Sequence, residues 1–273
     1  MKRLLNSELI LNFDGSIYHL GIMPEHLSET IITVGDQDRV EAISKYFDDV
    51  YFVKQNREFK TLKGRIGTKD ITIMSTGIGT DNIDIVFNEI AFLLQYDLQS
   101  RVKKEKYVAP NIIRLGTSGS VSPDIDLGST VYSKYAVSMD DLFKFYNHNF
   151  DQVEFDNRAY EVIPCSAKLE EKFDLYAPSL TLTAKGFYAP QFRNGVLPTK
   201  YKLADLAQIR YKNRPIGNIE METAGIYGLS KLLGFEAISI NAILADRITG
   251  KFSTNPQKTI DSMIQKTLEI LCK

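Results

Sequence analysis

The sequence predicts an α/β protein with a central sheet. Short apolar, β-branched runs alternate along the chain with segments whose apolar residues recur at helical spacing, which is typical of strands covered by helices. A length of 273 residues suits one such domain over residues 1–273, with a large core. The composition, 44% hydrophobic and 25% charged, is that of an ordinary globular chain.

Several runs are predicted to be strands because each is short, apolar and rich in Val, Ile or Thr. In chain order they are 31–34, 60–66, 71–75, 111–115, 129–131, 180–183 and 237–244. The strand at 111–115 is expected to open into a small-residue turn at Gly116 to Gly119. The run 31–34 is likewise followed by a glycine, Gly35.

Helices are predicted at 82–95, at 222–233 and at the end of the chain. The first places one apolar face towards the core, and this face consists of Ile83, Val86, Ile90 and Leu93. The last helix begins with Asn255 as its cap and Pro256 at the first helical position. Its apolar stripe consists of Ile260, Ile264, Leu268 and Leu271. The weakly patterned region 140–160 is expected to be a surface excursion or an oligomer contact.

Charge and cysteine content argue against several classes of partner and compartment. The formal net charge is −1, so no basic excess favours a nucleic acid or a membrane surface. No run reaches the roughly 20 apolar residues of a membrane span, and the start of the chain turns polar before a signal-peptide core forms. The two cysteines are too few for a disulfide framework. We therefore expect a cytoplasmic protein.

Two glycine-bearing strand exits each carry an arginine. Arg39 follows Gly35, and Arg114 lies at the end of the run 111–115. Backbone N–H groups at close range and a guanidinium fork can hold a phosphate-sized anion. For a single arginine an ordinary surface ion pair is the better interpretation, but an arginine at both exits favours an anion site. Because ligands of open α/β sheets bind beyond the carboxyl ends of strands, the two exits predict one shared phosphate site.

Other candidate residues stand in segments that also fit a structural role. Glu220 and Glu222 lie where the chain enters a predicted helix, and acids are common there because they complement the helix dipole. Gln191 and Arg193 stand two residues apart in an aromatic loop, where they could bind both sides of an imide, although a proline-turned surface loop explains them equally well. A lone histidine such as His19 is usually structural. The sequence contains no metal-ligand spacing, nucleophile elbow or Walker-type loop.

In order and spacing, these segments resemble the nucleoside phosphorylase superfamily, most closely its uridine phosphorylase branch. The resemblance runs from Tyr18 to about Lys251. Its landmarks are the segments 18–21, 35–40, 57–59, 75–79 and 113–119, the Gln191/Arg193 loop and Glu220-Met221-Glu222. The Gln191/Arg193 pair is the more specific mark of the branch that handles uracil.

The resemblance implies a fold and an activity. The fold would be a single-domain, three-layer phosphorylase type with a central mixed, partly barrel-like sheet flanked by helices. The activity would be phosphorolysis in nucleoside catabolism and pyrimidine salvage, in which uridine or a related pyrimidine nucleoside and phosphate give the free base and ribose 1-phosphate. Inorganic phosphate would be the co-substrate, with no cofactor. The active unit would be a homo-oligomer with shared active sites, either a dimer or a hexamer.

Carried over position by position, the resemblance assigns residues to each part of the substrates. Phosphate would be held by Gly35, Arg39, Arg57, Arg114 and Thr117, with Arg57 reaching in from a neighbouring subunit. The ribose would be bound by Met221 and Glu222, and by His19 from the neighbouring subunit. The base would be bound by Phe187, Gln191, Arg193, Asp246 and Arg247. Catalysis would depend on Arg114, Glu222, Gln191 and Arg193. In some members a monovalent cation lies at positions matching Glu58, Ile78 and Asn82, where Asn82 replaces the usual serine.

Asp246 leaves a second activity open, because uridine phosphorylases usually carry asparagine at this position. In the purine branch an aspartate here is the acid that faces the base. A purine nucleoside phosphorylase using Asp246 as acid is therefore the near alternative. A hydrolytic nucleosidase is disfavoured, because three arginines would be surplus for activating water. The non-enzymatic alternative is a catalytically silent homologue that binds nucleosides. The stretch 95–110 is longer than in typical bacterial members of the superfamily and could change subunit contacts.

Overall fold

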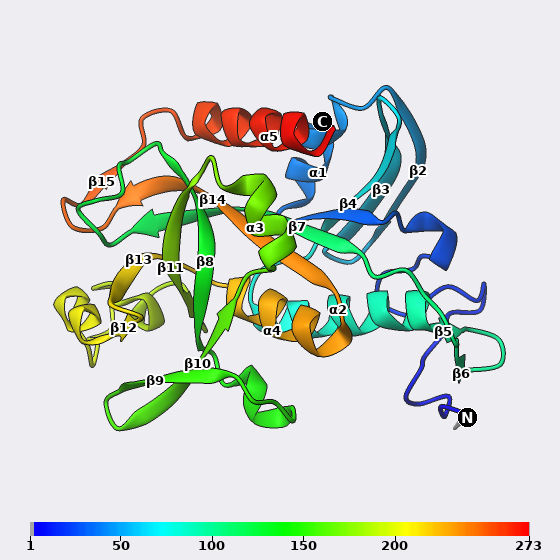
Figure 1. The fold of residues 1–273 in the computed structure, drawn as a ribbon, viewed down its shortest axis with the longest axis horizontal. Coiled ribbons are helices and arrows are strands. Elements are labelled where there is room, and N and C mark those ends of the chain that lie inside the picture. Colours follow the sequence, from blue (N-terminus) through cyan, green and yellow to red (C-terminus); the bar gives the residue numbers. More distant parts are fainter. Residues whose placement is uncertain (1–2, 273) are drawn as a thin grey trace. The chain divides into compact units, whose positions relative to one another are not determined.

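Two mixed α/β units make up the chain in the computed structural model, which describes residues 3–272 (Figure 1). The first contains residues 3–113, 229–236 and 272, and the second contains residues 114–228 and 237–271. The expectation of one domain over residues 1–273 stays a prediction.

The first unit is built on a sheet with the order β1-β4-β3-β2. Its elements are η1 (Pro24–His26), β1 (Thr30–Val34), α1 (Gln37–Ser44), β2 (Asp49–Asn56), β3 (Phe59–Ile66), β4 (Lys69–Ser75), α2 (Thr80–Gln95), β5 (Tyr96–Asp97) and β6 (Val102–Lys103). β1 pairs in parallel with β4, and the β4–β3 and β3–β2 pairs are antiparallel. β2 ends the sheet, and its Val50, Tyr51 and Val53 side chains are about half exposed. This edge therefore presents apolar surface to the surroundings.

Helix α2 confirms the predicted amphipathic segment, although it begins at Thr80 and not at residue 82. The four residues predicted to face the core are all fully buried. Gly79 precedes the helix with φ of 90°, a backbone conformation that favours glycine. A polar side chain, Glu89, is also buried on this helix.

The second unit contains most of the remaining elements. They are β7 (Asn111–Ser120), β8 (Thr130–Met139), η2 (Leu142–Phe145), β9 (Asp151–Phe155), β10 (Arg158–Pro164), α3 (Ala167–Phe173), β11 (Ala177–Ala184), η3 (Ala189–Gln191), η4 (Leu203–Gln208), β12 (Arg210–Tyr211), β13 (Arg214–Glu220), α4 (Thr223–Leu233), β14 (Glu236–Asp246), β15 (Lys251–Phe252) and α5 (Pro256–Cys272). The seven predicted strands are all present, several of them longer than predicted.

Five of these strands close into a barrel-like ring. Their order is β13-β11-β8-β14-β7, and β7 pairs back with β13 through Gly119 and Ser120. β11 runs parallel to both β13 and β8, whereas β14 is antiparallel to β8. Each strand of the ring therefore has a neighbour on both sides, as barrel closure requires. This confirms the predicted α/β class with a mixed, partly barrel-like sheet.

The predicted turn after residue 115 is wrong, because β7 continues in extended conformation to Ser120. Its last residues are needed to pair with β13 and close the ring. Gly116 is needed for packing and not for a turn. A Cβ atom built at this position would lie 1.7 Å from Nη1 of Arg114. The absence of a side chain at this position therefore makes room for the guanidinium.

Helices flank the ring and are bonded to it. Tyr227 of α4 donates its hydroxyl proton to the Ser133 carbonyl of β8 and accepts from the Ser239 N–H of β14, at 2.7 and 2.8 Å. Glu170 of α3 accepts from the Tyr132 hydroxyl of β8. The predicted cap of α5 is confirmed by a 3.1 Å bond from the Lys258 N–H to Asn255, and its apolar stripe is buried.

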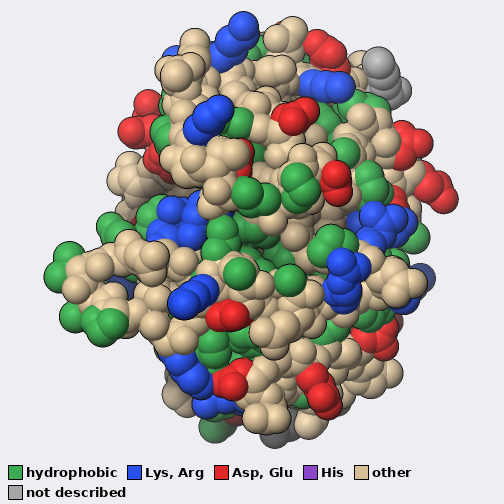
Figure 2. All heavy atoms as spheres, turned by 90° about the vertical axis from the view of Figure 1, so that its left-hand side faces the viewer, with side chains coloured by type: hydrophobic (Ala, Val, Ile, Leu, Met, Phe, Trp, Pro, Cys, Tyr) green, Lys and Arg blue, Asp and Glu red, His purple; other side chains and the backbone are tan. Residues whose placement is uncertain are grey.

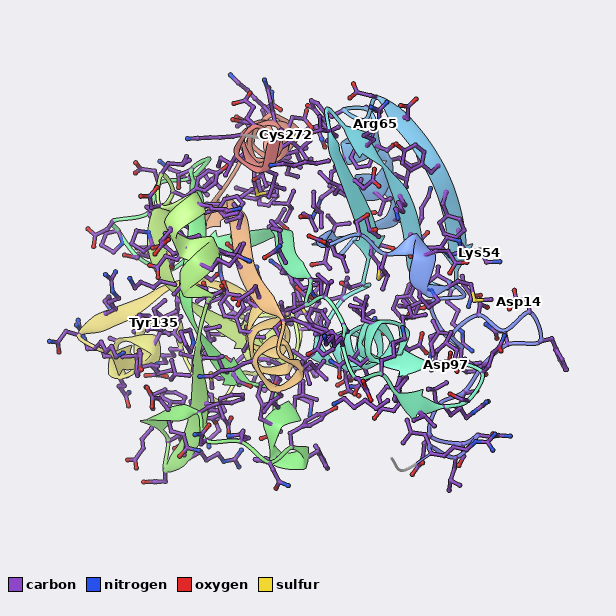
Figure 3. The ribbon with its side chains drawn as sticks, turned by 45° about the vertical axis from the view of Figure 1, so that its right-hand side comes forward. Asp14, Lys54, Arg65, Asp97, Tyr135 and Cys272 are labelled. Atoms are coloured by element: carbon purple, nitrogen blue, oxygen red, sulfur yellow. The ribbon has the colours of Figure 1, made fainter. Side chains whose placement is uncertain are left out.

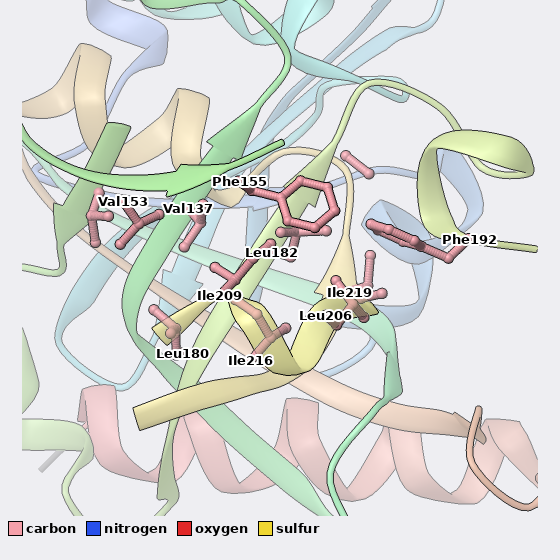
Figure 4. Close-up of a cluster of buried hydrophobic side chains, with 12 residues drawn as sticks. Val137, Val153, Phe155, Leu180, Leu182, Phe192, Leu206, Ile209, Ile216 and Ile219 are labelled. Carbon is pink, nitrogen blue, oxygen red and sulfur yellow. The ribbon is translucent and has the colours of Figure 1, made fainter. Parts of the chain in front are cut away.

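A hydrophobic cluster anchors the aromatic loop to the second unit (Figure 4). Phe192 lies within it and packs against Phe155, with ring centroids 6.3 Å apart. Phe155 comes from the β9–β10 hairpin, so the region 140–160 is not simply a surface excursion. Phe143 of the same region is also buried and contacts Gly228, where a Cβ atom would lie 2.0 Å from its ring. Whether this region also forms an oligomer contact stays a prediction.

Both cysteines are free thiols. Burial raises the pKa of Cys165 to about 12, so this thiol is unreactive at neutral pH. Cys272 is exposed at the end of α5 (Figure 3).

No helix among residues 3–272 is both long and apolar enough to span a membrane. On the face drawn in Figure 2, Lys and Arg side chains lie among acidic and hydrophobic ones and do not form one basic surface.

Candidate active site

Arg114 is buried at the centre of a polar network in the second unit. Its Nη1 donates to Oδ1 of Asn241 at 2.8 Å, and its Nη2 pairs with Glu222 at 2.5 Å and with Glu220 at 3.1 Å. Burial alone would lower the pKa of Arg114, but the two carboxylates raise it above its ordinary value. The network therefore holds a permanent cation beside two acidic groups.

The two carboxylates beside Met221 differ in their contacts. Glu220 is buried and accepts from the backbone N–H groups of Glu222 and Thr223 and from the Thr183 hydroxyl. It therefore holds the first turn of α4, which is the structural role expected for an acid at this position. Both carboxylates pair with the Arg114 guanidinium, Glu222 at the shorter distance. Of the two acids, Glu222 is thus the better candidate for contact with a substrate.

The loop that carries Gln191 and Arg193 turns at an unusual residue between them. Phe192 has φ of 59°, a left-handed conformation that is uncommon for a large side chain and often marks a functional site. Its buried ring fixes this turn, so the two polar side chains flank a rigid point. The Gln191 side chain is only 3% exposed, yet within the described residues its amide makes no hydrogen bond. Arg193 packs its guanidinium 4.1 Å from the centroid of the half-exposed Phe187 ring.

Arg247 reaches the same loop from the end of β14. Its Nη2 donates to the Gln191 carbonyl at 3.1 Å, whereas its buried Nη1 has no hydrogen-bond partner in the part of the chain that the structure describes. Burial and the nearby charge of Arg193 lower the pKa of Arg247 to about 10. Two guanidinium groups with little compensation attract an anion or a carbonyl oxygen. The structure therefore brings together four of the predicted base-binding residues, which are Phe187, Gln191, Arg193 and Arg247.

Asp246 holds the turn that follows β14. Its carboxylate accepts from the backbone N–H groups of Ile248 and Thr249, at 2.9 and 3.1 Å, and from the Thr249 hydroxyl. These hydrogen bonds lower the pKa of Asp246 below its ordinary value. The carboxyl group is therefore held in its ionised form, and its oxygens already accept hydrogen bonds from the turn. Both properties disfavour a role as a proton donor.

In the first unit, the exit of β1 and the tip of the β2–β3 hairpin are linked. The Gln37 side-chain amide, in the first turn of α1, donates to the Arg57 carbonyl at 2.8 Å. Arg57 is exposed and left-handed, with φ of 56°. Gly35 and Arg39 belong to the same exit. Because they lie in a different unit from Arg114 and Thr117, the predicted convergence of all five residues on one phosphate stays a prediction.

Two of the residues predicted to hold a cation, Glu58 and Asn82, lie next to Gly77. A Cβ atom at Gly77 would lie 2.4 Å from Nδ2 of Asn82 and 3.1 Å from Cγ of Glu58, so the structure brings these two side chains together. Nδ2 of Asn82 donates to the Ile78 carbonyl at 3.4 Å. Among residues 3–272, no group of three or more His, Cys, Asp and Glu side chains could hold a metal ion. The monovalent cation stays a prediction.

His19 is held by a residue that the sequence analysis missed. Nδ1 of His19 lies 2.7 Å from Oε1 of Glu89, whose side chain is 9% exposed. The signal was present in the sequence: Glu89 is an acid beside Ile90 and one turn after Val86, on the apolar face of the predicted helix. A charged residue on such a face needs a buried partner.

Comparison with protein families gives one match that covers most of the chain. Residues 29–273 match the family described as the phosphorylase superfamily. A uridine phosphorylase from Thermococcus kodakarensis is 26% identical, over 100% of this chain and 93% of that protein. A DeoD-type purine nucleoside phosphorylase from Buchnera aphidicola subsp. Acyrthosiphon pisum is 28% identical, over 92% of this chain and 97% of that protein.

Solved structures give the same result for the fold. A Trypanosoma brucei nucleoside phosphorylase, described as showing uridine phosphorylase activity, has a TM-score of 0.85 and 25% identity and covers 97% of this chain and 99% of its own. A uridine phosphorylase from the oomycete Phytophthora capsici has a TM-score of 0.73 and 20% identity, with 96% and 95% covered.

Proposed function

The chain belongs to the phosphorylase superfamily, and from this premise we propose that it cleaves uridine, or a related pyrimidine nucleoside, with phosphate. The products are the free base and ribose 1-phosphate. One observation carries the choice of base: Arg193 and Arg247 lie together at Gln191, and the buried Nη1 of Arg247 lacks a partner among the described residues.

These groups suit the departure of uracil. Breaking the N-glycosidic bond places negative charge on the base, and its two carbonyl oxygens share that charge. Guanidinium donors aimed at a carbonyl oxygen stabilise this charge as it develops. The Gln191 amide can both donate and accept, and it therefore suits an imide edge that offers an N–H beside a carbonyl.

The Arg114–Glu222 pair suits the sugar and the phosphate. The arginine supplies a cation for the incoming phosphate, and the carboxylate can accept hydrogen bonds from the ribose hydroxyls. Positive charge builds on the sugar as the bond breaks, and the Glu222 carboxylate favours it. Phosphate held below the anomeric carbon can react with it directly, so the protein needs no covalent nucleophile. This proximity can lower the barrier by several kcal/mol.

The active assembly is proposed to be a homo-oligomer, a dimer or a hexamer, in which Arg57 and His19 complete the site of a neighbouring subunit. The half-exposed apolar residues of edge strand β2, which ends next to Arg57, support such an assembly. We place the protein in the cytoplasm, where it would act in nucleoside catabolism and pyrimidine salvage with inorganic phosphate as its sole co-substrate.

A substrate panel tests the proposal. Uridine, thymidine, cytidine, inosine and adenosine are each incubated with the purified protein, with and without phosphate, and base release is measured. We expect uracil from uridine only when phosphate is present. Inosine or adenosine cleaved much faster than uridine would identify a purine phosphorylase, and cleavage without phosphate would identify a hydrolase. Binding without turnover in calorimetry would identify a silent homologue.

The Asp246→Asn variant separates the pyrimidine and purine mechanisms. We expect its kcat/KM for uridine to stay within about twofold of the wild-type value, because the amide oxygen still accepts from the Ile248 and Thr249 N–H groups. The measurement is initial rates of uracil and hypoxanthine release. A large loss of activity in this variant would show that the carboxyl group itself takes part in catalysis.

A further inference from the structure

We infer that Glu89 is a positioning residue that sets the tautomer of His19 and thereby makes its Nε2 an acceptor for the 5′-hydroxyl of the nucleoside. This inference rests on the proposed function, in which His19 meets that hydroxyl. Glu89 lies on α2, whereas His19 lies in the loop before η1, so the contact joins segments that are 70 residues apart.

Three donors of one loop converge on the Glu89 carboxylate. The backbone N–H of His19 donates to Oε1 at 2.9 Å, and the backbone N–H of Leu20 donates to Oε2 at 2.8 Å. The third is Nδ1 of the His19 ring, 2.7 Å from Oε1. An ionised carboxylate has only lone pairs to offer, so Nδ1 must carry a proton in this contact. In the neutral ring, Nε2 is then left with its lone pair.

Further contacts hold the loop from the other side. The Asn56 side-chain amide donates to the His19 carbonyl at 2.7 Å. The Tyr18 and His19 rings meet edge to face with centroids 4.7 Å apart, and the Arg57 guanidinium lies 5.7 Å from the Tyr18 ring centroid. The backbone is therefore fixed by several groups, but only Glu89 contacts a ring nitrogen of His19 within the described part of the chain. The His19 side chain is 28% exposed, so the ring remains accessible to a ligand.

The consequence for catalysis is selective. A mutation at Glu89 should weaken the enzyme only towards nucleosides that carry a 5′-hydroxyl, because the ring acts on that group alone. If Glu89 acted only through the His19 and Leu20 N–H groups, its loss would move the loop without changing which ring nitrogen of His19 carries the proton. Uridine and 5′-deoxyuridine, which differ only in this hydroxyl, show whether the contact to it is lost, and the protonated ring nitrogen of His19 distinguishes the two roles.

The experiment compares kcat/KM for these two substrates in the wild type, Glu89→Met, His19→Ala and the double variant. Methionine has a similar length but no oxygen that could accept from Nδ1–H of His19. We expect the preference for uridine over 5′-deoxyuridine to fall about tenfold in each single variant, the size of one hydrogen bond. The double variant should be no worse than His19→Ala. Glu171→Met makes the same chemical change on an exposed part of α3 and serves as the control. An unchanged preference in Glu89→Met overturns the inference.

A second measurement needs no substitution at Glu89. In ¹⁵N-histidine spectra recorded in alkaline buffer, the resonances lost in His19→Ala should show the Nδ1-protonated tautomer, and an Nε2-protonated ring would overturn the inference. Failure here is separate from failure of the proposed function. If the wild type cleaves uridine but the Glu89 variant keeps the wild-type preference for uridine over 5′-deoxyuridine, only the role of Glu89 is wrong. If the wild type cleaves no pyrimidine nucleoside, the proposed function is wrong.

Discussion

Replacing Arg114 by alanine should abolish phosphorolysis and destabilise the protein. In the proposed site the Arg114 guanidinium is the buried cation that binds phosphate, so we expect kcat/KM for uridine to fall about a thousandfold or more without it. The carboxylates of Glu220 and Glu222 would also lose their buried partner. An uncompensated buried charge costs about 3–5 kcal/mol of unfolding free energy. Steady-state kinetics and urea unfolding measure the two effects.

A second variant separates these two effects. Adding Glu222→Gln to Arg114→Ala removes one of the uncompensated charges, so part of the stability should return while activity stays lost. Arg210→Ala, an exposed arginine on β12, is the matched control and should change neither quantity. Arg114→Ala that is folded and as active as the wild type would contradict the proposed phosphate site.

Replacing Arg193 by alanine should slow bond cleavage more than it weakens binding. In the proposed mechanism its guanidinium stabilises charge that appears on uracil only as the bond breaks, so we expect kcat for uridine to fall about a hundredfold or more with a smaller change in KM. The loss should be smaller for 5-fluorouridine, because its base is the better leaving group. Initial rates of base release for both nucleosides measure the effect. Equal losses on the two would show that Arg193 only binds the base.

The sequence predicted the elements whose burial follows a simple period. α2 and α5 show one apolar stripe each. The strands β1, β4 and β14 contain continuous runs of buried residues, and β3 buries Phe59, Thr61 and Leu62. β2 was not predicted, although its sequence contains the apolar run Val50 to Val53; most of its residues are exposed because it lies at the sheet edge. β8 was cut short at residue 131 because Lys134 and Tyr135 interrupt its pattern, although pairing with β10 and β11 extends it to Met139.

Within the site, residue types could be predicted better than their partners. The Gln191/Arg193 pair was visible as a local motif, and Arg247 does join it across the fold. The different contacts of Glu220 and Glu222 depend on which acid meets the N–H groups of α4, and two acids this close in sequence give no such signal. The turn role of Asp246 depends on Thr249, whose hydroxyl could equally face solvent.

The two thiols have a practical consequence. A maleimide dye should label the protein once per chain without engineering, because Cys165 is buried and Cys272 is exposed. Every subunit would then carry a fluorophore at the same helix end. Energy transfer between identical dyes depolarises emission when chains associate, so anisotropy measured on dilution would report the stoichiometry of self-association directly in solution.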